Sequence, residues 1–362
     1  MGGRRMLEKR MEALRSLLRK QGLDAVIVTK EVNLMYFSGF RGDDTMLVVT
    51  PARQFLITDN RYTEQARQQA PRYELVEQKH GLTARTAELL AALGAKRIGF
   101  EGKHMTYQRY RDFASRLPEC TLTGDLDLDA LRQIKDAGEI AKIRKACEIA
   151  DAAYEDVLSF LRPGVTEFEV AAHMESYMRA HGSEGPSFAT IVASGKRGAL
   201  PHGTPTQKVI EEGDFVTMDY GAIYEGYHSD ITRTLCVGRA SERQRETYAH
   251  VLEAQELALT LIKPGASGKA VDAAVRQLFA RYGLDAYFGH GLGHSLGLEI
   301  HEEPRLSPHS TCEHLVPGML ITDEPGVYFA DWGGLRIEDT VLVTEQGSEA
   351  LTKATKKLIE II

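Results

Sequence analysis

Two acidic residues in the second half of the chain occupy the same position in a repeated segment. Residues 213–221 read Gly-Asp-Phe-Val-Thr-Met-Asp-Tyr-Gly and residues 318–326 read Gly-Met-Leu-Ile-Thr-Asp-Glu-Pro-Gly, which aligns Asp219 with Glu324. Both segments are apolar enough to be buried strands, and a charged side chain is costly to bury unless it has a partner. The repeat therefore predicts that these two carboxylates are compensated inside the protein.

Each of these residues has an acidic partner beyond the following turn. Asp219 and Asp230 lie symmetrically about the turn at 224–226, as do Thr217 and Thr232, so a simple hairpin would place each pair face to face. Opposed residues in antiparallel strands have Cβ atoms about 4.5–5.5 Å apart, and two carboxylates that close repel each other unless a cation lies between them. The hairpin therefore predicts a cation site.

Glu324 and Glu338 flank the turn at 331–334 in a similar way, although Pro325 interrupts that ladder. A single acidic residue in a strand is more often exposed on the solvated face of a sheet. Four of them at matched positions in two repeats favour metal ligands, because bridging cations explain both their burial and their pairing.

Histidines supply a second type of ligand. Residues 289–294 read Gly-His-Gly-Leu-Gly-His, and the glycines would let the backbone approach a ligand closely. An isolated histidine is more often structural, but His290, His294 and His301 share one short segment, and His202 is a further candidate. The same glycines do not form a dinucleotide-binding loop, because the sixth position of Gly-x-Gly-x-x-Gly is not glycine.

The first third of the sequence alternates helical and strand patterns, which predicts a small α/β domain. The acidic stretch 124–129 is expected to be a linker, so we place the two domains at residues 1–128 and 129–362. The predicted helices are 6–20 and 84–93, and the predicted strands are 25–28, 46–49, 55–58 and 97–100.

The second domain begins with a predicted helix through residues 140–161 and contains an internal repeat. Arg-Pro-Gly at 162–164 and Lys-Pro-Gly at 263–265 each precede a helical pattern. A duplicated unit is expected to pack about a pseudo-two-fold axis, which would bring Asp219 and Glu324 towards each other at its centre.

Composition and charge exclude several classes of protein. The 362 residues are 43% hydrophobic and 26% charged, as in a globular protein. The net charge of -7 argues against binding nucleic acid, no apolar stretch reaches the ~18 residues of a membrane span, and the basic start is amphipathic, unlike a signal peptide. The four cysteines form no Cys-x-x-Cys pair, which suits a reducing cytoplasm and buried, non-ligating roles.

Five of these segments resemble the metal-site motifs of the pita-bread metallopeptidases, which include prolidase, aminopeptidase P and methionine aminopeptidase. The resemblance extends from about residue 131 to the C-terminus. It implies an α/β (α+β) fold, in which a small creatinase-like N-terminal domain precedes a catalytic pita-bread domain. The segments that carry the resemblance are 218–221, 229–234, 290–294, 324–326 and 336–339.

The resemblance implies a pair of divalent metal ions and a bridging water as the nucleophile. Ligands of this hard type suit Mn(II), Co(II), Zn(II) or Fe(II), and the family favours Mn(II). The implied ligands are Asp219 on one ion, His294 and Glu324 on the other, and Asp230 and Glu338 bridging both.

Glu324 would also pass a proton from the water to the leaving nitrogen. Asp323 departs from the family pattern, which is usually apolar there, so it either perturbs Glu324 or faces outward. The other implied roles are stabilisation of substrate or of the tetrahedral intermediate by His202 and His301, contact with the proline ring by His290, and ordering of the site or contact with a substrate carboxylate by Arg336 and Tyr328.

Within the family, the sequence favours the proline-directed branch. Methionine aminopeptidases resemble the C-terminal half only and generally lack counterparts of His290 and Arg336. Creatine-hydrolysing relatives and binding proteins of the histone-chaperone kind share the fold but not the ligands. We therefore expect a cytoplasmic, homodimeric metallo-exopeptidase that acts on small peptides with proline in second position.

Three activities remain open for such a protein. Residues 297–302 look more like prolidases, which cleave Xaa-Pro dipeptides. The alternative is an aminopeptidase P that acts on longer Xaa-Pro peptides. A non-catalytic peptide-binding protein of the same fold is the third.

Overall fold

The computed structural model describes residues 2–362, with side chains described from Met6 onwards. The chain divides into two compact units, an N-terminal unit that ends at Arg132 and a C-terminal unit of residues Gln133–Ile362. Within the described part of the chain, no helix combines the length and apolar character that crossing a membrane requires. Cys147 and Cys236 are buried as expected, whereas Cys120 and Cys312 are only half-buried, and all four thiols are free.

The N-terminal unit is an α/β domain, as predicted. Its central strands are apolar and fully buried, and helices cover the sheet. The helices are α1 (Gly2–Gln21), α2 (Glu31–Ser38), α3 (Thr63–Gln69), α4 (Leu82–Ala92) and α5 (Tyr107–Arg116). The sheet contains six strands in the order β4 (Glu74–Glu77), β3 (Gln54–Thr58), β2 (Met46–Val49), β1 (Ala25–Val28), β5 (Arg97–Phe100) and β6 (Thr121–Thr123).

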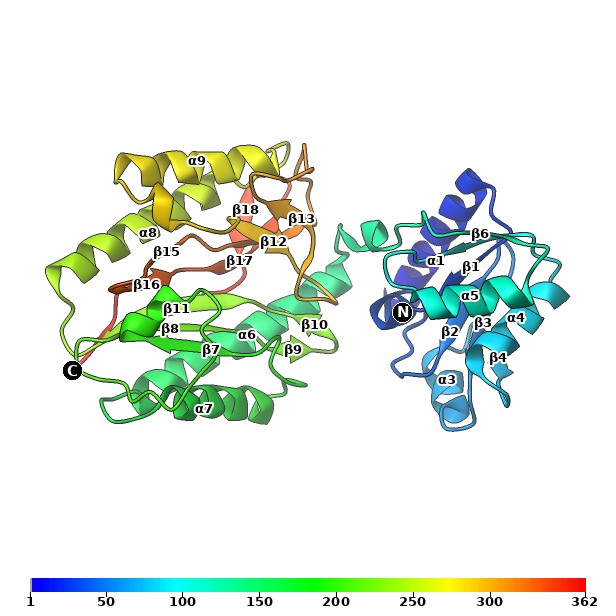
Figure 1. Ribbon diagram of the computed structural model, residues 1–362, viewed down its shortest axis with the longest axis horizontal. Coiled ribbons are helices and arrows are strands. Elements are labelled where there is room, and N and C mark those ends of the chain that lie inside the picture. The colour runs from blue at the N-terminus through cyan, green and yellow to red at the C-terminus, as the bar shows by residue number, and fades with distance from the viewer. Residues whose placement is uncertain (1) are drawn as a thin grey trace. The chain divides into compact units, whose positions relative to one another are not determined.

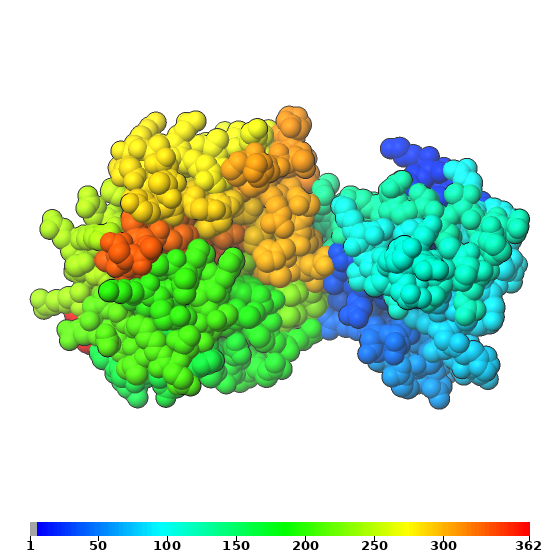
Figure 2. All heavy atoms as spheres, in the orientation of Figure 1, coloured from blue at the N-terminus to red at the C-terminus, as the bar shows by residue number. Residues whose placement is uncertain are grey.

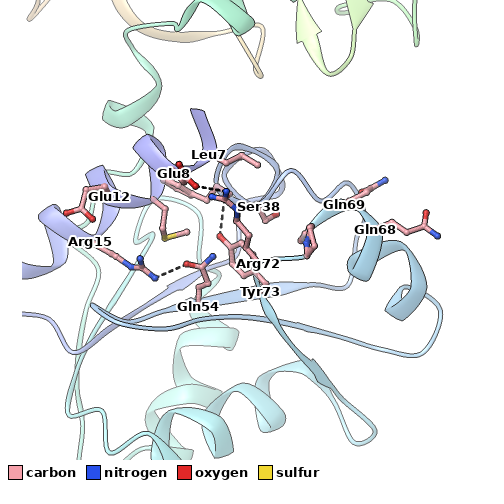
Figure 3. A pocket seen from close by; sticks show the side chains of 14 residues that line it. Leu7, Glu8, Glu12, Arg15, Ser38, Gln54, Gln68, Gln69, Arg72 and Tyr73 are labelled. Atoms are coloured by element: carbon pink, nitrogen blue, oxygen red, sulfur yellow. Dashed lines mark hydrogen bonds and ion pairs between the residues drawn. The ribbon is translucent and has the colours of Figure 1, made fainter. Parts of the chain in front are cut away.

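The N-terminal unit also contains a pocket of about 640 Å³ between α1 and the segment that follows α3 (Figure 3). Arg72 pairs with Glu8 across it at 2.6 Å, and Arg15 donates to Gln54 at 2.8 Å. None of the candidate site residues from the sequence lines this pocket.

The C-terminal unit begins with a first half in which two helices pack on one sheet. The apolar stripe at 140–161 forms α6, as predicted, and its first turn is capped by Asp136 and Glu139 in a capping box. The helices are α6 (Ala137–Phe160) and α7 (Glu167–Ala180), and the sheet order is β19 (Glu360–Ile361), β11 (Ile231–Val237), β8 (Phe215–Tyr220) and β7 (Ile191–Ser194).

The second half repeats this plan with different strand lengths. Figure 1 shows its helices on the opposite side of the strands from α6 and α7, and in Figure 2 orange-red atoms of the second half lie between its yellow atoms and the green atoms of the first half. The elements are α8 (Glu242–Leu261), α9 (Gly268–Arg281), β12 (Gly293–Ser295), β13 (Glu302–Leu306), β14 (Leu320–Asp323), β15 (Gly326–Phe329), β16 (Gly333–Arg336), β17 (Asp339–Val343) and β18 (Ser348–Ala350).

Each half has its own apolar core. Val157 of α6 and Met174 of α7 pack with Met218 of β8, whereas Val251 of α8 packs with Ile321 of β14. The strands therefore have one face on a helix pair and the other face towards the opposite half. Polar residues near the ends of β8 and β14 therefore lie between the two halves. The apolar core of each half holds its strand in place.

Candidate metal centre

Asp219 lies near the end of β8, opposite β11. The observed register pairs Asp219 with Thr232 and Thr217 with Thr234. The predicted face-to-face pairs, Asp219 with Asp230 and Thr217 with Thr232, are therefore wrong by two residues.

The turn explains this difference. β9 (Ile223–Tyr224) and β10 (Tyr227–His228) form a hairpin whose loop is Glu225 and Gly226, both at positive φ. A two-residue loop of this kind matches the twist of the strands and fixes the register. A shift of two residues keeps each side chain on its original face of the sheet, so Asp219 still faces Asp230 diagonally.

In the second half, the predicted arrangement agrees with the observed register. Asp323 pairs with Asp339 and Gly326 pairs with Arg336, and the ladder is interrupted at Pro325 between these pairs. Glu324 directly follows β14 and Glu338 directly precedes β17, so the two residues occupy matching positions between the paired segments.

Asp219, Asp230 and Glu338 form a compact group of buried carboxylates. One oxygen of each lies within 4.8 Å of the others, and the residues are 8%, 4% and 2% exposed. Asp219 Oδ1 and Asp230 Oδ1 are buried without a hydrogen-bond partner among residues 2–362. Buried acceptors are nearly always satisfied in proteins, so orphaned oxygens in an acidic group fit ligands of a cation. This group could hold a metal ion.

The electrostatics of the group lead to the same conclusion. Burial, followed by the charge of Glu338, raises the pKa of Asp230 well above its usual range. Burial, followed by the charge of Glu324, does the same to the pKa of Glu338. Burial also raises the pKa of Glu324 to about 7. A divalent cation would reverse these shifts, because it stabilises the ionised carboxylates.

His294 directs one ring nitrogen towards these carboxylates. Its Nδ1 lies 3.1 Å from the carbonyl oxygen of Ser295, so Nδ1 carries the hydrogen and Nε2 keeps its lone pair. Nε2 lies 3.6 Å from Asp230 Oδ2 and 3.5 Å from Glu324 Oε1. Burial lowers the pKa of His294 to about 3, so the ring is neutral, as a metal ligand must be.

Two threonines hold the acidic groups in place. The amide of His294 donates to Thr322 Oγ1 at 2.9 Å, and that hydroxyl donates to Glu324 Oε1 at 3.0 Å. Thr232 Oγ1 donates to Glu338 Oε2 at 2.5 Å, which joins a strand of the first half to a ligand candidate from the second. Sequence reasoning did not assign either threonine to the site.

Arg336 organises the opposite side of the group. It is 3% exposed and donates to Asp219, to the Tyr328 hydroxyl at 2.6 Å and to the Pro201 carbonyl at 3.3 Å. The Tyr328 hydroxyl lies 3.0 Å from Nε2 of His290, whose Nδ1 is bonded to the next carbonyl oxygen, so Nε2 accepts from Tyr328. Burial, followed by the charge of Arg336, lowers the pKa of His290 to about 4.

The remaining predicted residues lie around this group. The His301 ring packs edge-on against His294 with centroids 4.5 Å apart, and burial lowers the pKa of His301. His202 is exposed, and its charge contributes to lowering the pKa of both His290 and His301.

Asp323 does not face outward, which excludes one of the two expectations for it. It is fully buried, and neither carboxylate oxygen has a hydrogen-bond partner among residues 2–362. Burial, followed by the charge of Asp339, raises the pKa of Asp323 well above its usual range. Burial therefore favours the neutral form of this side chain, which limits its repulsion of Glu324.

Comparisons with known proteins identify the family of the chain. Residues 141–345 match the model of metallopeptidase family M24, and residues 10–134 match that of the creatinase/prolidase N-terminal domain. The chain is 41% identical to the Xaa-Pro dipeptidase of Pyrococcus furiosus over 357 residues, which cover 98% of this chain and 100% of that protein.

Solved structures of full-length proteins share the fold. The Xaa-Pro dipeptidase from Bacillus anthracis superposes with a TM-score of 0.95 at 43% identity, covering 98% of this chain and 99% of that one. An X-Pro aminopeptidase from Thermotoga maritima superposes with a TM-score of 0.89 at 38% identity, covering 94% and 98%. Since the family match spans more than half of the chain and these relatives cover nearly all of it, the chain belongs to metallopeptidase family M24 and has the pita-bread fold of that family.

Proposed function

We propose that this protein is a Xaa-Pro dipeptidase, which hydrolyses the bond between the first residue and proline and releases two amino acids. The observation that carries this proposal is the buried group of Asp219, Asp230 and Glu338 beside the neutral Nε2 of His294. The names of the relatives from Pyrococcus furiosus and Bacillus anthracis support the choice of substrate.

In this proposal, Asp219 would help to hold one divalent cation, His294 and Glu324 would help to hold the other, and Asp230 and Glu338 would contribute to both. A bound pair of divalent cations supplies Lewis acidity and a hydroxide-like nucleophile near neutral pH. We propose Mn(II) as the natural ion, a homodimer as the assembly and the cytoplasm as the location, as the family resemblance implies.

The protein side chains would then transfer protons and stabilise the charge that develops on the substrate. Glu324, which lies 3.5 Å from His294 Nε2 and accepts from Thr322 Oγ1, is placed to accept a proton from the attacking water and to pass it to the leaving proline nitrogen. His301 and His202 would donate hydrogen bonds to the substrate carbonyl as it becomes tetrahedral. His290, fixed by Tyr328, would lie against the proline ring.

Arg336 is better suited to ordering the site than to meeting a substrate carboxylate. Its guanidinium is buried, and it already donates to Asp219, Tyr328, Thr232 and the Pro201 carbonyl. A substrate carboxylate would have to displace these partners. The dipeptidase assignment therefore does not depend on Arg336 as the group that recognises the free end of proline.

Aminopeptidase P activity is the alternative, and the match to the X-Pro aminopeptidase of Thermotoga maritima favours it. The two activities differ in whether the cleft is closed beyond proline. A non-catalytic binding protein is disfavoured, because it has no use for a complete set of metal ligands, and elemental analysis of the purified protein tests that point directly.

The decisive experiment compares Ala-Pro, Ala-Pro-Ala and Ala-Ala-Ala with the same Mn(II)-loaded sample. We expect rapid cleavage of Ala-Pro, slow cleavage of Ala-Pro-Ala and no cleavage of Ala-Ala-Ala. Rapid cleavage of Ala-Pro-Ala would make the protein an aminopeptidase P. Efficient hydrolysis of Ala-Ala-Ala would exclude both proline-directed activities, and inactivity towards all three peptides by a sample with two bound ions would refute the proposed function.

A further inference from the structure

A buried ion pair lies beneath the β12–β13 hairpin. Lys135 Nζ lies 3.0 Å from Glu302 Oε2, and the two side chains are 1% and 5% exposed. Lys135 Nζ also donates to Ser295 Oγ at 3.0 Å. Taking two charges out of water is costly, and such a pair is weak evidence of a contribution to stability. Its position therefore calls for another explanation.

The pair contacts both sides of the hairpin next to candidate site residues. Ser295 follows His294 and accepts the hydrogen of its Nδ1 through the backbone carbonyl. Glu302 follows His301, and Ser295 and Glu302 are opposite each other in the ladder, directly after a register shift at His294. Lys135 thus joins the neighbours of both histidines.

Glu302 also shapes the loop between the two strands. Its Oε1 accepts from the amide of Glu299 at 3.2 Å, and a Cβ at Gly297 would come within 2.9 Å of its Oε2. The carbonyl of Gly297 in turn accepts from the amide of His228 at 2.8 Å. The loop is therefore packed closely around the Glu302 carboxylate.

The backbone of Lys135 is also hydrogen-bonded to the segment that leads into β14, the strand directly before Glu324. The amide of Lys135 donates to the carbonyl of Gly318 at 2.9 Å, just before β14. Lys135 therefore connects the β12–β13 hairpin to the segment that carries Thr322 and Glu324. A change at this residue would move His294 and His301 relative to Glu324.

We propose that Lys135 and Glu302 are positioning residues, which hold the hairpin so that His294 reaches the metal ion and His301 reaches the reacting carbonyl. This inference rests on the proposed function. Partners of metal-bound histidines typically change metal affinity or activity by about 10–100-fold when they are removed. Misplacing a catalytic group by about 1 Å has a similar effect on turnover.

The test uses the double variant Lys135→Met/Glu302→Leu. Replacing a buried ion pair by apolar residues of similar volume often preserves stability, whereas a single substitution would leave one charge unpaired. The matched control is Arg144→Met/Glu349→Leu, which removes a half-exposed ion pair at 2.8 Å in the same unit. Mn(II) affinity is measured by titration calorimetry, and kcat and KM are measured for Ala-Pro at saturating Mn(II).

We expect the double variant to bind one of the two ions about 10-fold more weakly. At saturating Mn(II), its kcat should fall about 10–100-fold with KM within about threefold of wild type. Adding His301→Ala to this variant should cost much less than adding it to the wild type, because the pair acts through His301. The control should match the wild type in every measurement.

Wild-type affinity and wild-type kcat in the double variant would overturn the inference. If that variant does not fold, Ser295→Ala replaces it, since this change removes one acceptor of Lys135 and leaves both charges. Ser295→Ala should then weaken one ion about threefold, and an unchanged affinity would also overturn the inference. A wild-type protein that binds no Mn(II), or does not cleave Ala-Pro, would instead refute the proposed function.

Discussion

The two halves of the C-terminal unit place an acidic residue at the same strand position but surround it differently. Asp219 in the first half is paired with Arg336, a fixed cation. Glu324 in the second half lies beside the neutral His294 and the hydroxyl of Thr322, and burial raises its pKa to about 7. Duplication therefore explains the geometry, while later differences in the partners separate a charge-compensated ligand from one that can exchange a proton.

The threonine two residues earlier shows the same divergence. Thr217 and Thr322 occupy equivalent positions, yet Thr217 bonds to Thr234 across the sheet at 3.0 Å, whereas Thr322 bonds to Glu324 at 3.0 Å. One hydroxyl serves the sheet and the other orients a ligand candidate. The second half thus carries the carboxyl group that can exchange a proton, together with the hydroxyl that orients it.

Removal of the metal ions should have the largest effect on activity, because ligand candidates come from both halves. Dialysis against a chelator should abolish hydrolysis of Ala-Pro, because the nucleophile depends on the cations. Most of the fold should persist, since the two apolar cores lie on the outer faces of the strands. Activity and far-ultraviolet circular dichroism are measured before and after addition of Mn(II) or Co(II). Full activity in a sample shown to be metal-free would contradict the two-metal mechanism.

The second prediction separates the bridging carboxylates from Asp219. Asp230→Ala and Glu338→Ala should weaken metal binding more than Asp219→Ala, because a bridging carboxylate compensates two cations. We expect at least about 100-fold for Asp230 and Glu338 and at least about 10-fold for Asp219, because removal of a mere partner of a metal ligand already costs about 10–100-fold. Titration calorimetry with Mn(II) measures all three variants. A larger loss in Asp219→Ala would reverse the assignment of terminal and bridging ligands.

The sequence predicted the repeat, the main strands and the grouping of Asp219, Asp230 and Glu338 because these depend on local patterns. Runs of apolar residues predicted the bounds of β1, β2 and β5 as they are observed, and matched acidic positions indicated a shared site. It did not predict β4, whose residues are all at least partly exposed, or β6, which has three residues. Short or mixed segments lack the periodicity that identifies an element.

Register and supporting contacts were harder to predict than residue identity. The hairpin loop places Glu225, which is not glycine, at a φ of 47°, and this shifted the register from the symmetric expectation. Lys135 and Glu302 are 167 positions apart in the sequence, so no local pattern relates them. Thr322 could have been found, because it repeats the position of Thr217 relative to the acidic residue.

The third prediction concerns His290, which contacts Tyr328 and not the carboxylate group. His290→Ala should retain both ions but lower kcat for Ala-Pro about 10-fold or more, because the proline ring loses a wall of its pocket. Tyr328→Phe is the companion variant, since it keeps the His290 ring and removes the hydroxyl that contacts both His290 and Arg336. Elemental analysis and kinetics are measured together. Loss of one ion from His290→Ala would mean that His290, and not His294, is the ligand.

The last prediction concerns the change of metal affinity with pH, and it tests the contrast between the neutral imidazole and the carboxyl groups whose pKa is raised. Burial raises the pKa of Glu324 to about 7, and burial with neighbouring charges raises that of Asp230 well above its usual range. Near pH 7, Glu324 of a metal-free site is therefore partly protonated, and binding of a cation must displace that proton.

Because protons compete with the cation, Mn(II) affinity should rise with pH between about 6 and 8, by about tenfold per pH unit for each proton released. His294 should release none in this range, since its pKa of about 3 leaves the ring neutral throughout. Calorimetry in two buffers of different ionisation enthalpy at pH 7 measures the number of protons released. We expect at least one proton to be released per chain. Glu324→Gln should reduce the number of protons released. His294→Ala should weaken Mn(II) binding without changing that number. An affinity independent of pH over this range would mean that the carboxyls are already ionised, and the contrast between the two halves would then not lie in proton exchange.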